Sequence, residues 1–441
     1  MSALPRRRAD EHRAAVDSAP TGRPAASHGV ARAVGLGLIT GAADDDPSAI
    51  GTYAAAGAAV GPAILWTAPV TFPMMFAVVY LSAKLGQVTG QGLFAVIRAH
   101  YARRVLWITL VGVVIGNTFE AAADLGGMAA ALQLLIPWRF EVLVTAIGAI
   151  IFALQWWGSY ETIRNVFRVL ALVLLAYVGA AFLAHPDWPA VLRGTLVPTL
   201  RFDRETLSLL VAIIGTSLSA YLYTWQSNQE VEEEIAMGRR RLRDRVGASR
   251  RELAESRRDI LYGMVFSNIV MYFIILSTAA TLFAAHKGGI QTAADAAKAL
   301  EPLAGRAAGI LFTLGVVGVG FLAIPVMTTG AAYDVSQSFG WHNSLGAKPH
   351  EAGKFYGVIA GVTAIAVGLN FLGLNPMKVL VWSGIVQGFS TPPLMLLILR
   401  MTNNRRIMGQ RTNGLAINTL GWITTAAIFA ASAGLAITWF I

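Results

Sequence analysis

Three consecutive carboxylates stand in the stretch ITGAADDDPSAIGTY, residues 39 to 53, between residues that are otherwise apolar or small. Asp44, Asp45 and Asp46 are followed directly by Pro47 and Ser48. Carboxylate and hydroxyl oxygens are the ligands that hard cations such as Mg²⁺ and Mn²⁺ prefer. Because the 441 residues contain no cysteine, a thiolate site for a softer metal is excluded. The pattern therefore indicates a cation site built from oxygen atoms.

The elements around these acids have the composition of membrane spans. Apolar residues make up 55% of the chain and charged residues only 14%, which is unlike a soluble domain. Runs of about 20 apolar residues match the thickness of a bilayer, and their length and continuity exclude the alternating strands of a membrane barrel. Eleven helices are predicted, at residues 31–59, 62–84, 105–134, 141–157, 165–184, 206–227, 259–284, 307–332, 355–374, 378–399 and 415–440.

The acids fall inside the first predicted span, so that span is expected to be broken. A carboxylate in mid-membrane costs about 2.5 to 3.5 kcal/mol on insertion scales and normally faces a polar cavity. Pro47 lacks an N–H and disfavours helical geometry at Asp46. The alternative is an exterior loop that holds the acids, but residues 31 to 43 alone are too short to span. The break, with its free backbone groups, is expected to line a site.

A second interruption occurs in the sixth span, in GTSLSAYLYTWQSNQEVEEE, residues 215 to 234. Gly215, Thr216, Ser217 and Ser219 interrupt an apolar run there. Discontinuous helices tend to occur in pairs, one in each half of an inverted repeat, with the substrate between the two breaks. Small hydroxyl residues are equally common where helices pack, so packing is the alternative reading of this segment.

Orientation follows from the distribution of Lys and Arg. If the N-terminus is cytoplasmic, 27 of the 35 basic residues lie on the inside and eight on the outside, which places the C-terminus outside. Residues 1–29 are predicted to be a disordered, basic cytoplasmic tail without a signal peptide. The Arg-rich stretch from Arg239 to Arg258 follows span six, where lipid headgroups account for its charge. No nucleic-acid partner is expected, and the oligomeric state stays open.

Four stretches together resemble one family. They are GLGLITGAADDDPSAIGTYAAAGAAVG, GNTFEAAADLGGMAAAL, GTSLSAYLYTWQSNQEVEEE and LNPMKVLVWSGIVQGFSTPPLM. They look like the first, third, sixth and tenth spans of the Nramp family of divalent-metal transporters, and more closely its bacterial branch of Nramp-related magnesium transporters. The resemblance implies an all-α, polytopic LeuT-like fold. In that fold, two inverted five-helix repeats, about 30–185 and 205–400, precede an eleventh span at 415–440, and helices 1 and 6 are discontinuous within a transporter domain of residues 30–441.

The resemblance also implies roles for individual residues. Asp46 matches the metal-binding aspartate of an Asp-Pro-Gly-Asn motif, whereas Ala49 stands where that motif has asparagine and keeps only its carbonyl. Thr216 matches a residue whose carbonyl binds metal. Ser219 falls where other members carry a metal-binding methionine, and Tyr221 falls where they carry a histidine.

The third span also departs from the family pattern, in residues that carry protons. Asp124 keeps the place of an acid of the proton route, but Asn117 and Gly127 fall where that route has glutamates. None of the seven histidines lies in a predicted span. The predicted function is therefore transport of a divalent cation by alternating access across a bacterial inner membrane, with Mg²⁺ favoured, Mn²⁺ tolerated and no proton coupling. The alternative is a proton-coupled Mn²⁺ or Fe²⁺ transporter. No cofactor is expected beyond the transported ion.

The expected site residues form two sets. The predicted metal-binding set is Asp45, Asp46, Ala49, Thr216, Ser219 and Gln387. The predicted cavity or pathway set is Asp44, Ser48, Asp124, Tyr221, Trp225, Gln226 and Gly384. For Asp44, helix capping is the alternative to cavity lining. Glu120 and Asp124 lie four residues apart and are either cavity acids or an internal polar pair, the cavity being favoured for Asp124.

The remaining acids and two other classes of membrane protein fit the sequence less well as explanations of its function. Glu230, Glu232, Glu233 and Glu234 are predicted to form a solvated face or salt bridges. An intramembrane aspartyl protease would need a Gly-X-Gly-Asp partner for Tyr333-Asp334, and the sequence contains none. A Na⁺-coupled solute transporter of the same fold would need a first break able to receive a carboxylate, which DDDP repels. A transporter, and not an enzyme, is predicted.

Overall fold

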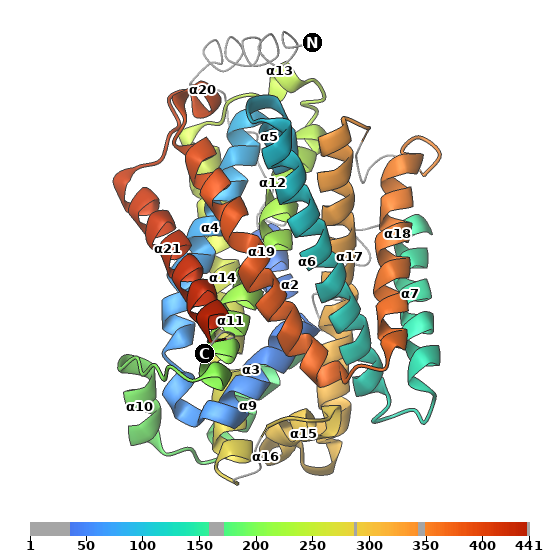
Figure 1. The fold of residues 1–441 in the computed structure, drawn as a ribbon, viewed down its shortest axis with the longest axis vertical. Helices are drawn as coiled ribbons and strands as arrows, with labels where there is room; N and C mark the ends of the chain where they lie inside the picture. The colour runs from blue at the N-terminus through green and yellow to red at the C-terminus, as the bar shows by residue number, and fades with distance from the viewer. Residues whose placement is uncertain (1–35, 158–171, 286–288, 343–348, 439–441) are drawn as a thin grey trace.

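The structure is a computed structural model that describes residues 36–157, 172–285, 289–342 and 349–438. The predicted N-terminal tail, residues 1–29, and the first part of the predicted fifth span lie outside these ranges. Every regular element within them is a helix, and the helices run mostly along the long axis of the molecule (Figure 1).

In the part of the chain that the structure describes, nine helical segments are long and apolar enough to span a membrane. They are Thr67–Thr89, Arg103–Leu132, Phe140–Trp157, Arg204–Ala236, Arg250–Phe283, Ala293–Phe339, Gly353–Leu372, Pro376–Thr402 and Leu415–Ile437. The remaining two of the eleven predicted spans are the broken first helix and the fifth, which the structure describes from Leu172 onward. The prediction of a polytopic all-α membrane protein is confirmed.

Individual helices have the following bounds. The long helices are α3 (Pro47–Val60), α4 (Thr67–Thr89), α6 (Arg103–Leu132), α7 (Phe140–Trp157), α11 (Arg204–Ser217), α12 (Ala220–Ala236), α14 (Arg250–Thr278), α17 (Ala308–Phe339), α18 (Gly353–Leu369), α19 (Pro376–Thr402) and α21 (Leu415–Ile437). The short helices are α2 (Leu36–Asp44), α5 (Leu93–His100), α9 (Ala176–Leu183), α10 (Trp188–Leu196), α13 (Leu242–Arg245), α15 (Ala293–Ala297), α16 (Glu301–Ala304) and α20 (Arg405–Met408). Single turns are η1 (Gly61–Ile64), η2 (Leu172–Leu175), η3 (Ala279–Phe283), η4 (Lys298–Leu300), η5 (Gly305–Ala307) and η6 (Asn370–Leu372).

The first span is broken where the sequence predicts. Helix α2 ends at Asp44 and α3 begins at Pro47, whose missing N–H costs nothing at the first position of a helix. Asp46 is the N-cap of α3, with extended backbone, and its side chain accepts a hydrogen bond from the Ala49 N–H. The local sequence is therefore sufficient to stop one helix and start the next.

The sixth span is broken between α11 and α12. Leu218 leaves helical geometry and Ser219 is the N-cap of α12, but its side chain makes no capping hydrogen bond. Both predicted breaks are therefore confirmed.

Close backbone approach holds the broken helices against their neighbours. Gly41 of α2 faces the backbone of Gly263 in α14, and Gly215 of α11 faces the Gly384 carbonyl of α19. A Cβ at Gly41 or Gly215 would collide with that backbone, so only glycine permits these two crossings.

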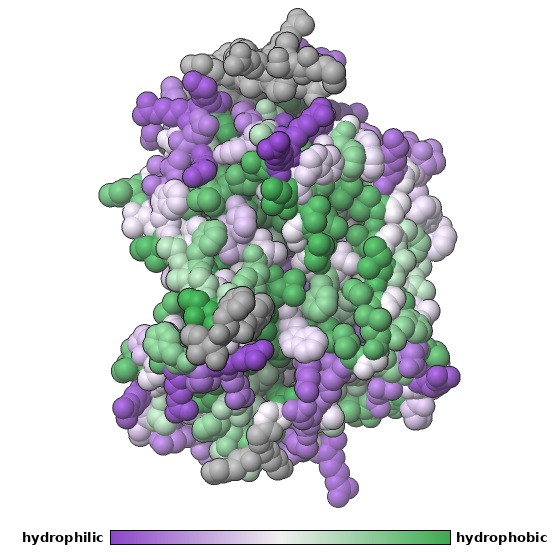
Figure 2. Space-filling model, viewed as in Figure 1, coloured by the Kyte–Doolittle hydropathy of each residue, from purple (hydrophilic) through white to green (hydrophobic). Residues whose placement is uncertain are grey.

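The surface has the pattern of a membrane protein. Figure 2 shows a band of hydrophobic side chains at mid-height, between hydrophilic ends. Ile108, Val111 and Ile115 of α6 are exposed although apolar, which is expected where lipid rather than water covers the surface. The basic helices α13 and α20 lie together at one end of the molecule (Figure 1).

Candidate metal site

The two breaks contact each other in the interior. The Ser48 hydroxyl of α3 lies 3.4 Å from the Thr216 hydroxyl of α11. The Tyr221 hydroxyl of α12 donates to Asp46 Oδ2 at 3.0 Å and to the Ala43 carbonyl of α2 at 2.7 Å. The four half-helices therefore meet near the centre of the molecule (Figure 1).

Asp46 is held in place but keeps capacity for another ligand. Its Oδ1 accepts from the Ala49 N–H and the Ser48 hydroxyl, both at 2.7 Å, and its Oδ2 accepts from Tyr221. A carboxylate offers about four lone-pair sites. Three donors leave room for a cation on a carboxylate whose position is already fixed.

Glu120 of α6 joins the two breaks. Its Oε1 accepts from the Ser219 hydroxyl at 2.9 Å and lies 3.4 Å from the Ser48 hydroxyl. Its Oε2 accepts from Gln387 Nε2 of α19 at 2.7 Å. Glu120 is fully buried, and its hydrogen-bond partners lie outside α6 rather than at Asp124, so a cavity role stays a prediction.

Asp124 and Gln387 complete the surroundings. Asp124 Oδ1 accepts from the Ser48 N–H at 2.9 Å, while its Oδ2 has no hydrogen-bond partner. Gln387 Oε1 accepts weakly from the Ala220 N–H at 3.4 Å. The Ser219 hydroxyl also reaches the carbonyls of Gly215 and Thr216, at 3.1 and 3.0 Å. The polar side-chain atoms of Asp46, Glu120, Asp124, Ser219 and Gln387 are all oxygen or amide nitrogen, and one sulfur atom, Met271 Sδ, lies 3.9 Å from the Ser217 hydroxyl at the end of α11.

Asp44 and Asp45 turn toward a different helix. Both accept from the Ser267 hydroxyl of α14, at 2.5 Å for Asp44 Oδ2 and 3.2 Å for Asp45 Oδ1. The metal-binding role of Asp45 stays a prediction, because its hydrogen bond is to Ser267 rather than to the residues around Asp46. The role of Ser267, one polar residue within the apolar part of span seven, was missed from the sequence.

The side chains buried around the breaks include five acids. Asp44, Asp45, Asp46, Glu120 and Asp124 are all at most 1% exposed. Within the described residues, the salt bridges all lie elsewhere. No three Asp, Glu or His side chains in that part of the chain converge on a single point. A cation bound here would complete its shell with hydroxyls, carbonyls and its own water, and would neutralise uncompensated charge.

Two further predicted residues, Trp225 and Gln226, lie beyond the break on α12. Gln226 accepts from the Thr40 hydroxyl of α2 at 2.6 Å and donates to Glu230 at 3.0 Å. Glu230 also accepts from Gln87 of α4 at 2.6 Å. Trp225 is buried. These contacts tie α2 to α12 and α4, on the side of the break toward α13.

The prediction of a solvated face after span six is wrong for Glu230 and Glu234, which are only 5% and 4% exposed. The reason is that α12 continues to Ala236 and packs against neighbouring helices. The salt-bridge part of that prediction holds, since Arg239 lies 3.5 Å from Glu234. Gly384 serves close packing, because a Cβ there would lie 2.6 Å from the Ala212 carbonyl.

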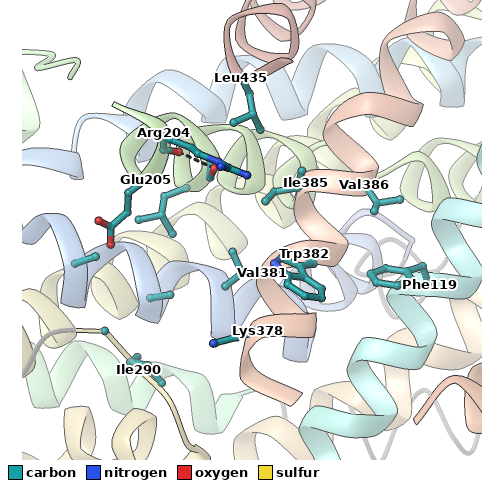
Figure 3. Close-up of a pocket in the computed structure, with 15 residues that line it drawn as sticks. Phe119, Arg204, Glu205, Ile290, Lys378, Val381, Trp382, Ile385, Val386 and Leu435 are labelled. Carbon is teal, nitrogen blue, oxygen red and sulfur yellow. Dashed lines mark hydrogen bonds between the residues drawn. The ribbon is translucent and has the colours of Figure 1, made fainter. Parts of the chain in front are cut away.

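A cavity of about 860 Å³ is lined by residues of α3, α6, α11 and α19, the helices that also carry site residues (Figure 3). Phe119 and Val386 in its wall are sequence neighbours of Glu120 and Gln387. Arg204, Glu205 and Lys378, at the first turns of α11 and α19, also line it. Those turns are the helix ends away from α13 and α20, so the cavity lies on the side opposite the basic helices.

Comparison with known proteins decides the family. The sequence model described as Nramp, natural resistance-associated macrophage protein-like, matches residues 37–438. The chain belongs to the Nramp family. Nramp proteins are metal transporters, so this Nramp protein is a transporter and not an enzyme, as predicted. Its multi-pass membrane location is confirmed with it.

Relatives and solved structures agree with this assignment. The divalent metal cation transporters MntH of Klebsiella pneumoniae (strain 342) and Deinococcus radiodurans are each 26% identical to this Nramp protein. The matches cover 87% and 90% of this chain, and 88% and 87% of those relatives. A manganese transporter structure from Eremococcus coleocola has a TM-score of 0.67 at 16% identity, covering 95% of this chain and 89% of that one.

The fold extends beyond metal transporters. A Na⁺-coupled sialic acid symporter has a TM-score of 0.58 at 13% identity, over 99% of this chain and 97% of that one. At such identities the likeness shows the fold alone, and it confirms the LeuT-like fold class. The boundaries of the two repeats stay a prediction.

Proposed function

We propose that this Nramp protein transports hard divalent cations by alternating access, with the ion bound between the two helix breaks. One observation carries the proposal. Asp46 of the first break and Ser219 of the second break belong to one hydrogen-bond network, in which the Ser48 hydroxyl lies between Asp46 and the buried Glu120, and Glu120 accepts from Ser219. Two carboxylates and several hydroxyls, with no sulfur or imidazole among them, are ligands for Mg²⁺ and Mn²⁺ rather than for soft metals.

Two cations have to be distinguished. The names of the relatives, which refer to divalent metal cations and manganese, support Mn²⁺ more directly than Mg²⁺. The donor set supports both, since Mn²⁺ and Mg²⁺ share oxygen ligands. We therefore propose Mn²⁺ as a substrate and Mg²⁺ as a second substrate. Support for Mg²⁺ comes from Ser219 and Ala49, because neither side chain offers a soft or amide ligand that would replace the water Mg²⁺ retains.

Proton coupling is proposed to be absent. Asn117 and Gly127 stand where the family resemblance implies glutamates of the proton route. Asn117 faces Gln387 at 3.4 Å, and Gly127 packs near Leu380. Neither can carry a proton. Glu120 and Asp124 are the acids that remain on α6, and the experiment below decides whether they are sufficient for coupling.

The membrane orientation is part of the same proposal. Helices α13 and α20 carry exposed arginines at one end of the molecule. By the positive-inside rule this end is cytoplasmic, so the 860 Å³ cavity at the other end faces outward. We place the protein in the bacterial inner membrane, with the N-terminus inside and the C-terminus outside.

The test uses purified protein in liposomes loaded with a Mg²⁺-sensitive, Mn²⁺-sensitive or pH-sensitive dye. We expect influx of both cations, mutual competition between them, and no acidification above that of empty liposomes. Mn²⁺ influx without Mg²⁺ influx or competition would refute Mg²⁺ as a substrate. Acidification that requires external Mn²⁺ or Mg²⁺ would refute uncoupled transport and establish the proton-coupled alternative.

A further inference from the structure

Asp44 and Asp45 form a buried carboxylate pair separate from the group around Asp46. Both side chains are fully buried, and both accept from Ser267 Oγ of α14, so this pair faces α14. Asp46 instead faces α12 through Tyr221. Consecutive residues at the helix break thus direct their carboxylates to two different neighbours.

The pair has unused ligand atoms. Asp44 Oδ1 and Asp45 Oδ2 are inaccessible to solvent and have no hydrogen-bond partner among the residues that the structure describes. A single serine hydroxyl has one proton to share between two carboxylates. A buried, unpaired carboxylate oxygen is costly in a medium of low dielectric constant, so these two oxygen atoms indicate a ligand that the protein itself does not supply.

Protons alone satisfy this arrangement poorly. A proton on Asp44 Oδ2 could donate to Ser267 Oγ, but it would leave Asp44 Oδ1 and Asp45 Oδ2 without a partner among the described residues. A cation would instead take both oxygens as ligands and cancel both charges. The site also lies at the C-terminal end of α2, where the last carbonyls lack intrahelical partners and the negative end of the helix dipole favours positive charge.

From these observations we infer a second divalent-cation site formed by Asp44, Asp45 and Ser267. Two carboxylates match the charge of one divalent ion, and an all-oxygen set selects a hard one. The inference is additional to the proposed function, because the transport site at Asp46 requires one ion and the Ser267 side of the break would hold another.

The experiment counts bound ions. Purified full-length protein in detergent is dialysed against Mn²⁺ in a buffer without Na⁺, and bound Mn²⁺ per chain is measured. We expect two ions for the wild type, one for Asp44→Asn, one for Asp46→Asn and none for the double variant. Ser267→Ala should weaken one of the two sites by about tenfold or more.

A matched control is Ser277→Ala on the same helix. Ser277 is as buried as Ser267, but its hydroxyl donates only to the Ile274 carbonyl. This variant should keep both ions, and size-exclusion chromatography checks that each variant is folded. The wild-type count is informative even if an Asp44 variant fails to fold.

The outcomes separate the two proposals. One wild-type ion that is lost in Asp46→Asn and kept in Asp44→Asn would overturn the second site and leave the proposed function standing. One ion that requires Asp44 but not Asp46 would support the Asp44 site and overturn the proposed transport site. One wild-type ion that is lost in both single variants, or two ions that are lost together in either folded variant, would show that Asp44 and Asp46 do not hold separate sites, and would overturn the inference.

Discussion

The two helix breaks differ in what creates them. At the first break, Pro47 directly follows the cap residue Asp46, and the Asp46 side chain accepts hydrogen bonds from its own neighbours Ser48 and Ala49. At the second, the Ser219 side chain makes no cap. Its hydroxyl goes to Glu120 of α6 and to carbonyls of α11, while Tyr223 donates to the Leu218 carbonyl.

The first break is therefore determined by the local sequence, and the second by tertiary contacts. The first break is encoded by residues that would interrupt a helix in any setting. The second persists because Tyr223 of α12, Gln387 of α19 and the Ser219 hydroxyl bond to the backbone that the break leaves free. The first break also supplies a carboxylate, that of Asp46, whereas the second supplies neutral oxygens, so substitutions at the two breaks should have unequal effects.

The largest expected effect is that of Asp46→Ala. It removes the carboxylate of the first break, which also contacts Tyr221 of α12, and charge-assisted contacts of this kind contribute about 3 kcal/mol, or roughly 100-fold in affinity. We expect Mn²⁺ and Mg²⁺ uptake into liposomes to fall to the level of empty vesicles.

Asp203→Ala is the control for Asp46→Ala. Asp203 also caps a helix and accepts from a backbone N–H, that of Thr206, but it lies exposed at the start of α11. Transport should survive this change. Wild-type uptake by Asp46→Ala would show that the ion does not pass between the breaks.

The next effect in size concerns Glu120, which the sequence left open between two roles. Glu120→Gln keeps the shape and one acceptor oxygen for Ser219 or Gln387, but it replaces the other oxygen by an NH₂ donor and removes the charge. We expect Mn²⁺ affinity to fall by about 10- to 100-fold, measured by calorimetry, with unchanged thermal unfolding. Unchanged affinity would mean that Glu120 only braces the second break and contributes no charge to the site.

The contrast between the two breaks also explains how much of the fold and of the site could be predicted from the sequence. The first break was predictable because DDDPS contains its own helix stop and its own charge. The second was predicted only from the pairing of breaks in inverted repeats, since Ser219 in an apolar run equally suits helix packing. The burial of Glu230 was mispredicted because nothing in its neighbourhood shows that α12 continues to Ala236. Ser267 could not be found at all, as its partners lie more than 200 residues away.

Changing the neutral ligands should alter selectivity more than transport rate. Methionine is a soft donor that favours Cd²⁺ and offers Mg²⁺ little. We expect Ser219→Met combined with Ala49→Asn to raise Cd²⁺ affinity by about tenfold and to lower Mg²⁺ uptake. Both changes are needed, because a thioether without a side-chain amide beside it leaves the shell incomplete. Unchanged Cd²⁺ binding together with intact Mg²⁺ uptake would show that these two positions do not face the ion.

The smallest effect is expected for Tyr223→Phe, which tests whether tertiary contacts maintain the second break. The change leaves the buried Leu218 carbonyl without the Tyr223 hydroxyl, and an unpaired buried group costs about 1 to 3 kcal/mol. We expect a lower unfolding temperature in detergent and slower uptake, with unchanged Mn²⁺ affinity, since no ligand is removed. Tyr177→Phe is the matched control, because Tyr177 is equally buried and its hydroxyl has no partner, so its loss should not destabilise the protein. If the two variants unfold alike, the Leu218 carbonyl does not depend on Tyr223, and the second break would be as locally determined as the first.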